Sequence, residues 1–129
     1  MKTINGRTSE YEIDDIFLKR HSPRAMSGEK ISEEELMTLF EAARWAPSSF
    51  NAQPWRFVYA MRGTPEFENH FSLLVDANKS WCINAGALIV TISRKTFEYN
   101  GKPSVTHSFD SGAAWENFAF TSSAMSFSK

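Results

Sequence analysis

The segment APSSFNAQPW at residues 46–55 separates a predicted helix from a predicted strand. It consists of turn-forming residues with a proline near each end, which favours a rigid connector. On its N-terminal side, Ser32 and Glu35 have the spacing of a capping box, and apolar residues then recur at helical intervals until Pro47 ends the helix. On its C-terminal side, residues 56–61 (RFVYAM) are rich in aromatic and β-branched residues, which predicts a strand.

The sequence predicts further elements on both sides of this core. Residues 1–12 are polar and predict an arm, and a short helix follows from Ile13 to about His21, because Pro23 disfavours its continuation. The elements predicted after residue 61 are a short helix from Thr64, a loop over 76–80, a strand over 87–93 and a last helix that Asp110 caps and that ends near Met125. Only two strands are convincing, whereas a sheet usually needs three. Either strands are missed or the chain is a fragment.

Composition excludes several classes of protein. The 129 residues form one domain's worth of chain, and a hydrophobic content of 42% is too high for a disordered protein. A net charge of -1 argues against nucleic acid or an anionic membrane as a partner. The longest apolar run, residues 85–92, is too short to cross a bilayer, and the N-terminus has no signal-peptide pattern. We therefore expect a soluble, cytoplasmic protein.

Single chemical groups predict little catalytic chemistry. Cys82 approaches a buried strand and is more typical of a packed thiol than of a nucleophile, and Trp55 is expected to be a core anchor. The three histidines are scattered, so we expect no metal site. The last helix is apolar around most of its circumference, which indicates burial either in a large core or at a subunit interface.

Four blocks of sequence, taken together, resemble the nitroreductase family. In chain order they are RHSPR at 20–24, APSSFNAQPW at 46–55, NKSW at 78–81 and DSGAAWEN at 110–117. The resemblance runs from about Ile16 to Met125. It implies an α+β fold in which helices flank a sheet, an FMN cofactor, NAD(P)H as electron donor, and a homodimer with flavin at the subunit interface.

The resemblance also implies which residues bind the cofactor. Arg20 and Ser22 suit its phosphate or ribityl group, and Arg24 would lie near the pyrimidine edge of the flavin, where a positive charge favours hydride uptake. The serines and Asn51 of the central connector would reach the flavin of the partner subunit. The full implied set is Arg20, His21, Ser22, Arg24, Pro47, Ser48, Ser49, Asn51, Gln53 and Asn78.

Two of these assignments leave a plainer alternative open. Lys19, Arg20 and Arg24 also complement the C-terminal end of a helix, where positive charge is favourable. Asn78 resembles the family's amide that hydrogen-bonds the ring edge, but it is also a common turn residue.

The implied function is hydride transfer from NAD(P)H through FMN to a nitroaromatic, a quinone or a similar small-molecule acceptor, by a ping-pong mechanism. No protein residue is expected to be catalytic, because the flavin carries the chemistry. Family members usually continue past the last helix into further strands and a tail, so we expect a single, C-terminally truncated domain over residues 1–129. The alternative is a non-catalytic, truncated, dimerising remnant that binds flavin weakly or not at all. A third possibility keeps FMN but fragments flavin or removes halogen from aromatic rings.

Overall fold

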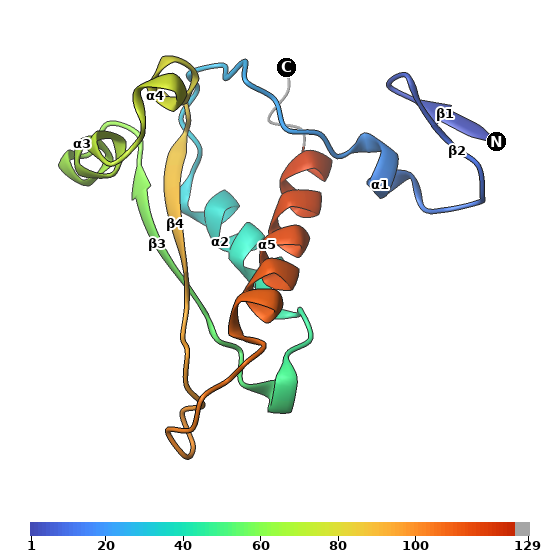
Figure 1. The fold of residues 1–129 in the computed structure, drawn as a ribbon. Helices are drawn as coiled ribbons and strands as arrows, with labels where there is room; N and C mark the ends of the chain where they lie inside the picture. The colour runs from blue at the N-terminus through green and yellow to red at the C-terminus, as the bar shows by residue number, and fades with distance from the viewer. Residues whose placement is uncertain (126–129) are drawn as a thin grey trace.

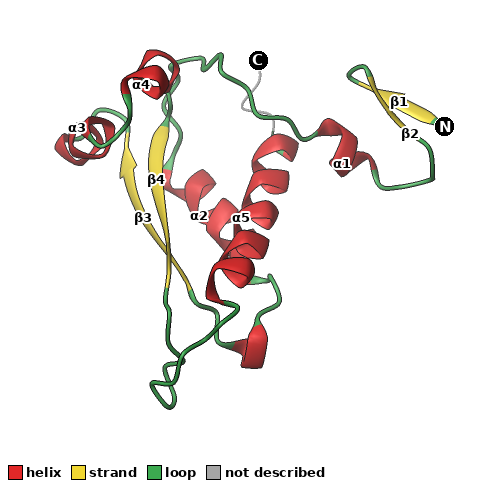
Figure 2. Ribbon diagram, in the orientation of Figure 1, coloured by secondary structure: helices red, strands yellow, loops and turns green. Residues whose placement is uncertain are grey.

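The structure is a computed structural model, and it describes residues 1–125 of the chain. Figures 1 and 2 show a long antiparallel ribbon of two strands with two helices packed beside it, and a separate N-terminal hairpin on the far side of those helices. In chain order the elements are β1 (Lys2–Ile4), β2 (Arg7–Ser9), α1 (Asp15–Lys19), α2 (Glu33–Arg44), a 3₁₀-helix η1 (Ser49–Asn51), β3 (Trp55–Met61), α3 (Pro65–Ser72), α4 (Asp76–Cys82), β4 (Ala87–Ser93) and α5 (His107–Ala124). Residues 126–129 of the predicted domain lie outside the described part.

Strands β3 and β4 form the main ribbon, with Trp55 opposite Ser93 at one end and Met61 opposite Ala87 at the other. Alternate side chains point to opposite faces. On one face Phe57 stacks on Phe40 of α2, with ring centroids 5.1 Å apart. The two strands predicted from the sequence are therefore confirmed, and aromatic packing against α2 positions them.

Helix α2 begins as its sequence predicts. The Ser32 hydroxyl accepts the backbone N–H of Glu35, and the Glu35 carboxylate accepts the backbone N–H of Ser32. Leu36, Leu39 and Ala43 form its buried stripe. Burying this stripe, more than helix propensity, stabilises the helix.

Helix α5 packs along α2 and starts earlier than expected (Figure 1). The prediction that Asp110 caps this helix is wrong: the helix begins at His107, with Thr106 as the N-cap residue. The Thr106 hydroxyl donates to the Asp110 carboxylate over 3.0 Å. This hydrogen bond stabilises an additional helical turn before Asp110. Ala114 is fully buried, whereas Trp115 remains 48% exposed, so the rest of the chain covers only one side of α5.

The connection between β3 and β4 contains a helix that the sequence analysis missed. A loop was predicted over residues 76–80, but α4 occupies this segment. Lys79 pairs with Asp76 one turn away, at 3.1 Å, and Cys82 is buried at the helix end. Seven residues with no regular apolar period gave no helical signal, and tertiary burial of Cys82 stabilises this short helix.

The predicted arm at residues 1–12 contains a hairpin. Strands β1 and β2 pair antiparallel across a turn at Asn5 and Gly6, both with positive φ, as a two-residue hairpin turn of type I′ requires. Helix α1 follows, and the Asp14 carboxylate caps it by accepting the N–H of Ile16.

Candidate functional site

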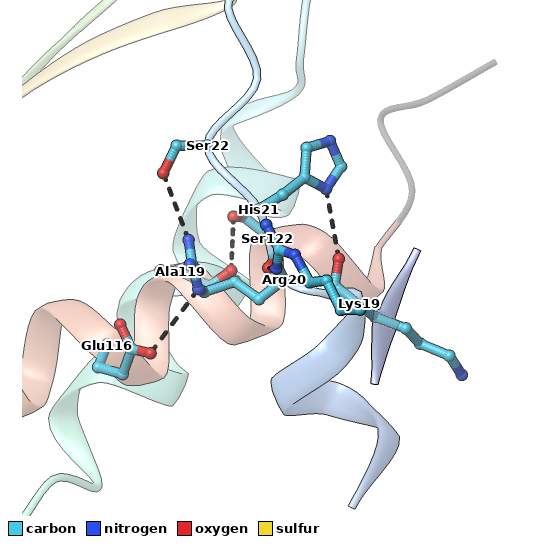
Figure 3. Close-up of polar contacts among 8 residues, drawn as sticks. Lys19, Arg20, His21, Ser22, Glu116, Ala119 and Ser122 are labelled. Carbon is cyan, nitrogen blue, oxygen red and sulfur yellow. Dashed lines mark hydrogen bonds and ion pairs between the residues drawn. The ribbon is translucent and has the colours of Figure 1, made fainter. Parts of the chain in front are cut away.

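The first group of predicted residues lies at the C-terminal end of α1, against α5 (Figure 3). Arg20 is the C-cap residue, so its side chain leaves the helix as the backbone turns extended. Its Nε lies 3.8 Å from the Glu116 carboxylate of α5, and its Nη1 donates to the Ser22 hydroxyl over 3.4 Å. The guanidinium is thus oriented on one edge by a carboxylate, while its other edge faces Ser22.

The neighbouring residues of this group are more exposed. His21 Nδ1 lies 3.3 Å from the Lys19 carbonyl, so the ring contacts the last residue of α1 (Figure 3). Arg24 is exposed and takes part in no ion pair within residues 1–125. The segment therefore presents cationic and hydroxyl groups to the surface, a donor set suited to an anion such as phosphate.

The second group lies on the bend at residues 48–53, around η1. The Ser48 hydroxyl accepts the backbone N–H of Gln53 over 3.0 Å, and the Gln53 side-chain amide donates to the Asn51 side-chain oxygen over 3.0 Å. Pro47 precedes the bend and is exposed. These local hydrogen bonds shape the bend independently of any ligand.

The backbone of the bend is held in an uncommon conformation. Phe50, Asn51 and Gln53 all have positive φ, at 52°, 50° and 47°. Positive φ is costly for a bulky residue such as Phe50, whose ring is 79% exposed and meets Phe97 edge-on at 5.7 Å. Strained backbone of this kind clusters at functional sites, so it supports a role for the bend.

Two carboxylates hold the Arg20 group and the bend against α5. The sequence analysis did not assign either carboxylate to the site. Asp110 is 5% exposed and accepts the backbone N–H of Ser49 over 3.0 Å, and Glu116 pairs with Arg20 as described. Both belong to the DSGAAWEN block, but nothing in the spacing of that block indicates their distant partners.

One chain does not bring all the predicted residues together. The bend contacts α5 at Asp110 and the α1 end contacts it at Glu116, six positions or about 9 Å further along the helix axis. Asn78 lies on α4, at the opposite end of the ribbon from the bend (Figure 1). Two surface hollows of about 280 and 290 Å³ are lined by other residues, namely Met1, Lys2, Ser9, Tyr11, Glu12 and Ile13, and Thr91, Ser93, Ser108, Ser111, Gly112 and Trp115.

Other reactive side chains have structural roles. Cys82 is buried, as predicted, and burial raises the pKa of its thiol, which disfavours the nucleophilic thiolate. Ser93 Oγ and His107 Nδ1 lie 2.7 Å apart and join the end of β4 to the start of α5. In the described part of the chain, no set of three or more His, Cys, Asp or Glu side chains is arranged to hold a metal ion. No helix there is both long and apolar enough to span a bilayer.

Comparison with known proteins shows which family this chain resembles. The family model described as "Nitroreductase family" matches residues 17–72, which include the end of α1, all of α2 and the bend. Over these residues the chain is similar to the nitroreductase family. Among curated nitroreductases, the oxygen-insensitive NADPH nitroreductase of Helicobacter acinonychis is 40% identical over 67 residues, 52% of this chain and 31% of that protein. The oxygen-insensitive NAD(P)H nitroreductase of Enterobacter cloacae is 38% identical over 50 residues, 38% of this chain and 23% of that protein.

A solved structure extends the likeness to the whole fold. The crystal structure of an FMN-containing oxidoreductase superposes with a TM-score of 0.91 at 44% identity, and the match covers 97% of this chain. It confirms the predicted nitroreductase-like α+β fold. The same match covers 65% of the FMN-containing oxidoreductase, so this chain spans less than two thirds of that protein.

Proposed function

We propose that two copies of this chain together bind FMN and transfer hydride from NAD(P)H to an oxidised small molecule. The match of residues 17–72 to the nitroreductase family model and the FMN-containing structural relative support this proposal. Bound FMN would accept hydride from NAD(P)H and, in a second half-reaction, pass it to a nitroaromatic, a quinone or a similar acceptor. The chain's own residues bind and orient the cofactor and tune its charge.

The observation that carries the proposal is the orientation of the Arg20 guanidinium between Glu116 and Ser22. A phosphate dianion needs donors that already point in one direction, and an arginine fork beside a hydroxyl supplies them. Glu116 occupies the Nε edge of Arg20, which leaves the edge next to Ser22 for an anion. The residues present therefore fit the phosphate end of FMN.

The second half of the site would come from the partner copy. Within one chain the bend at 48–53 contacts α5 at Asp110, about 9 Å along the helix axis from the Arg20 contact at Glu116, and we infer that the two groups serve different flavins. Trp115 of α5 is half exposed and Phe50 is 79% exposed, and burying such aromatics stabilises a subunit interface. We place Ser48, Ser49 and Asn51 on the flavin of the second copy.

Titration of the purified chain with FMN tests this proposal directly. We expect one FMN per chain, with quenched flavin fluorescence, and a dimer by sedimentation. Arg20→Ala should weaken FMN binding about ten- to a hundredfold, because a charge-assisted contact is lost. Arg44→Ala is the matched control, since Arg44 is an exposed α2 residue paired with Glu41. A chain that dimerises without taking up FMN would be the non-catalytic remnant instead.

The redox half of the proposal needs its own assay. The FMN-loaded protein should oxidise NAD(P)H in the presence of a nitroaromatic or a quinone, with the parallel-line kinetics of a ping-pong enzyme. If the protein binds FMN but does not oxidise NAD(P)H in any such assay, it is a flavin-binding protein, and the proposed oxidoreductase activity is rejected. The cytoplasmic location stays a prediction from the sequence.

A further inference from the structure

The N-terminal hairpin contacts α1 at both of its ends. Lys2 of β1 forms an ion pair with Asp15 in the first turn of α1, and Arg7 Nη1 of β2 donates to the backbone carbonyl of Arg20 just after the last turn. The hydrogen bond from Lys2 lowers the pKa of Asp15, which favours its charged form. The hairpin thus spans the length of α1.

The hydrogen bond from Arg7 to the Arg20 carbonyl holds the C-terminal end of α1 in place. Helix α1 has only five residues, which is too short to hold its own end in place, and the last carbonyls of any helix lack intrahelical partners. A guanidinium on the Arg20 carbonyl satisfies such a group with a charge-assisted hydrogen bond. The peptide that leads from Arg20 into His21 and Ser22 is fixed from outside the helix.

We propose that Arg7 is a positioning residue for the cofactor phosphate. Arg7 fixes the backbone at Arg20 while Glu116 orients the Arg20 side chain, so that the guanidinium and the Ser22 hydroxyl are held together in advance of binding. Preorganised donors bind an anion more tightly because less conformational freedom is lost on binding. This inference rests on the proposed function, since it assigns Arg7 to the phosphate half of the same site.

If Arg7 positions the phosphate-binding groups, its loss should weaken binding only of ligands that carry the phosphate. Riboflavin has the ring and the ribityl chain of FMN without the phosphate, so comparing the two ligands isolates the phosphate contact. We expect Arg7→Met to weaken FMN binding about five- to twentyfold and riboflavin binding less than about twofold. Arg7→Lys keeps a charged donor of nearly the same reach and should restore most of the FMN affinity.

Lys2→Met is the matched control variant. It removes a positive charge and the other hairpin contact to α1, but it leaves the Arg7 hydrogen bond intact. FMN affinity should stay within about twofold of the unmodified chain, since Lys2 touches Asp15 and not Arg20. Circular dichroism of each variant checks that the fold is retained.

The experiment measures dissociation constants of FMN and riboflavin for the full chain by flavin fluorescence quenching. Equal weakening of both ligands in Arg7→Met would show that the hairpin only supports the fold, and unchanged FMN binding would also overturn the inference. A loss in Arg7→Lys as large as in Arg7→Met would show that a donor at this position does not hold the site and would reject positioning. Absence of FMN binding by the unmodified chain would instead reject the proposed function, and this inference with it.

Discussion

A single buried carboxylate, Asp110, attaches the bend at 48–53 to the start of α5. It accepts the Ser49 N–H and the Thr106 hydroxyl, each over 3.0 Å, and it lies in the first turn of the helix, where negative charge is favourable. Without it, the Ser49 N–H would lose its acceptor in a partly buried place. One residue therefore couples the geometry of the bend to the stability of the fold.

We expect Asp110→Ala to lower the free energy of unfolding by about 1–3 kcal/mol, the cost of an unsatisfied buried donor. Urea denaturation followed by circular dichroism measures it. Asp110→Asn keeps an acceptor oxygen and should lose less. Asp76→Ala is the control, because Asp76 is exposed and its pair with Lys79 is a surface contact. Equal losses in both alanine variants would contradict the role given to Asp110.

Arg24 differs from Arg20 in having no ion-pair partner within residues 1–125. If it lies near the flavin ring, its charge acts more on hydride uptake than on affinity. We expect Arg24→Ala to slow reduction of bound FMN by NAD(P)H about tenfold or more, with a smaller loss of FMN affinity. Stopped-flow flavin absorbance and equilibrium titration give the two values. Proportional losses in both would argue that Arg24 is only a binding residue.

At the scale of elements, α2 depends on its capping box. The backbone N–H and the hydroxyl of Ser32 both donate to the Glu35 carboxylate, and these hydrogen bonds lower the pKa of Glu35 from its ordinary value of 4.5. The folded state therefore favours the ionised carboxylate. This stabilisation is complete above about pH 4.5 and is lost as the pH falls through the lower folded pKa.

The pH dependence of unfolding tests the capping box. We expect the unmodified chain to exceed Glu35→Gln in stability at neutral pH, and the difference to shrink as the pH falls below about 4.5, where the protonated acid resembles the amide. Urea unfolding at several pH values measures it. Glu34→Gln, in the same first turn of α2 but outside the capping box, should show a weaker dependence. A constant difference for Glu35→Gln across this range would contradict the assignment.

At the scale of the whole molecule, α5 separates the two groups of candidate cofactor residues. The Arg20 group contacts it at Glu116 and the bend contacts it at Asp110. Under the proposed function, each flavin site takes the Arg20 group from one chain and the bend from the other. Mixing two variants, each defective in one group, should therefore restore some intact sites.

Two variants that are defective in different groups should complement each other. Arg20→Ala removes the phosphate contact, and Asn51→Gly removes the amide of the bend while tolerating the positive φ at that position. In a random mixture half of the dimers are mixed and each has one intact site, so about one quarter of the sites should regain full FMN affinity. FMN titration after unfolding and refolding the mixture together measures this. Binding no better than the average of the separate variants would place each site within a single chain.

The local elements followed from the sequence because their signals join residues close together in the chain. The capping box of Ser32 and Glu35, the strand over 87–93 and the turn formers of 46–55 each depend on neighbours within a few positions. The four ordered blocks were enough to indicate the family and the α+β fold, which the comparisons confirm.

Only the tertiary structure decided the features that depend on distant residues. Helix α4 forms where burial of Cys82 outweighs a weak local signal, and a hydrogen bond between distant residues attaches the bend to α5. The Ser49 contact to Asp110 joins residues 61 positions apart, and Arg7 reaches the Arg20 carbonyl across 13. Spacing within a sequence carries no record of such partners, because folding alone brings these groups together.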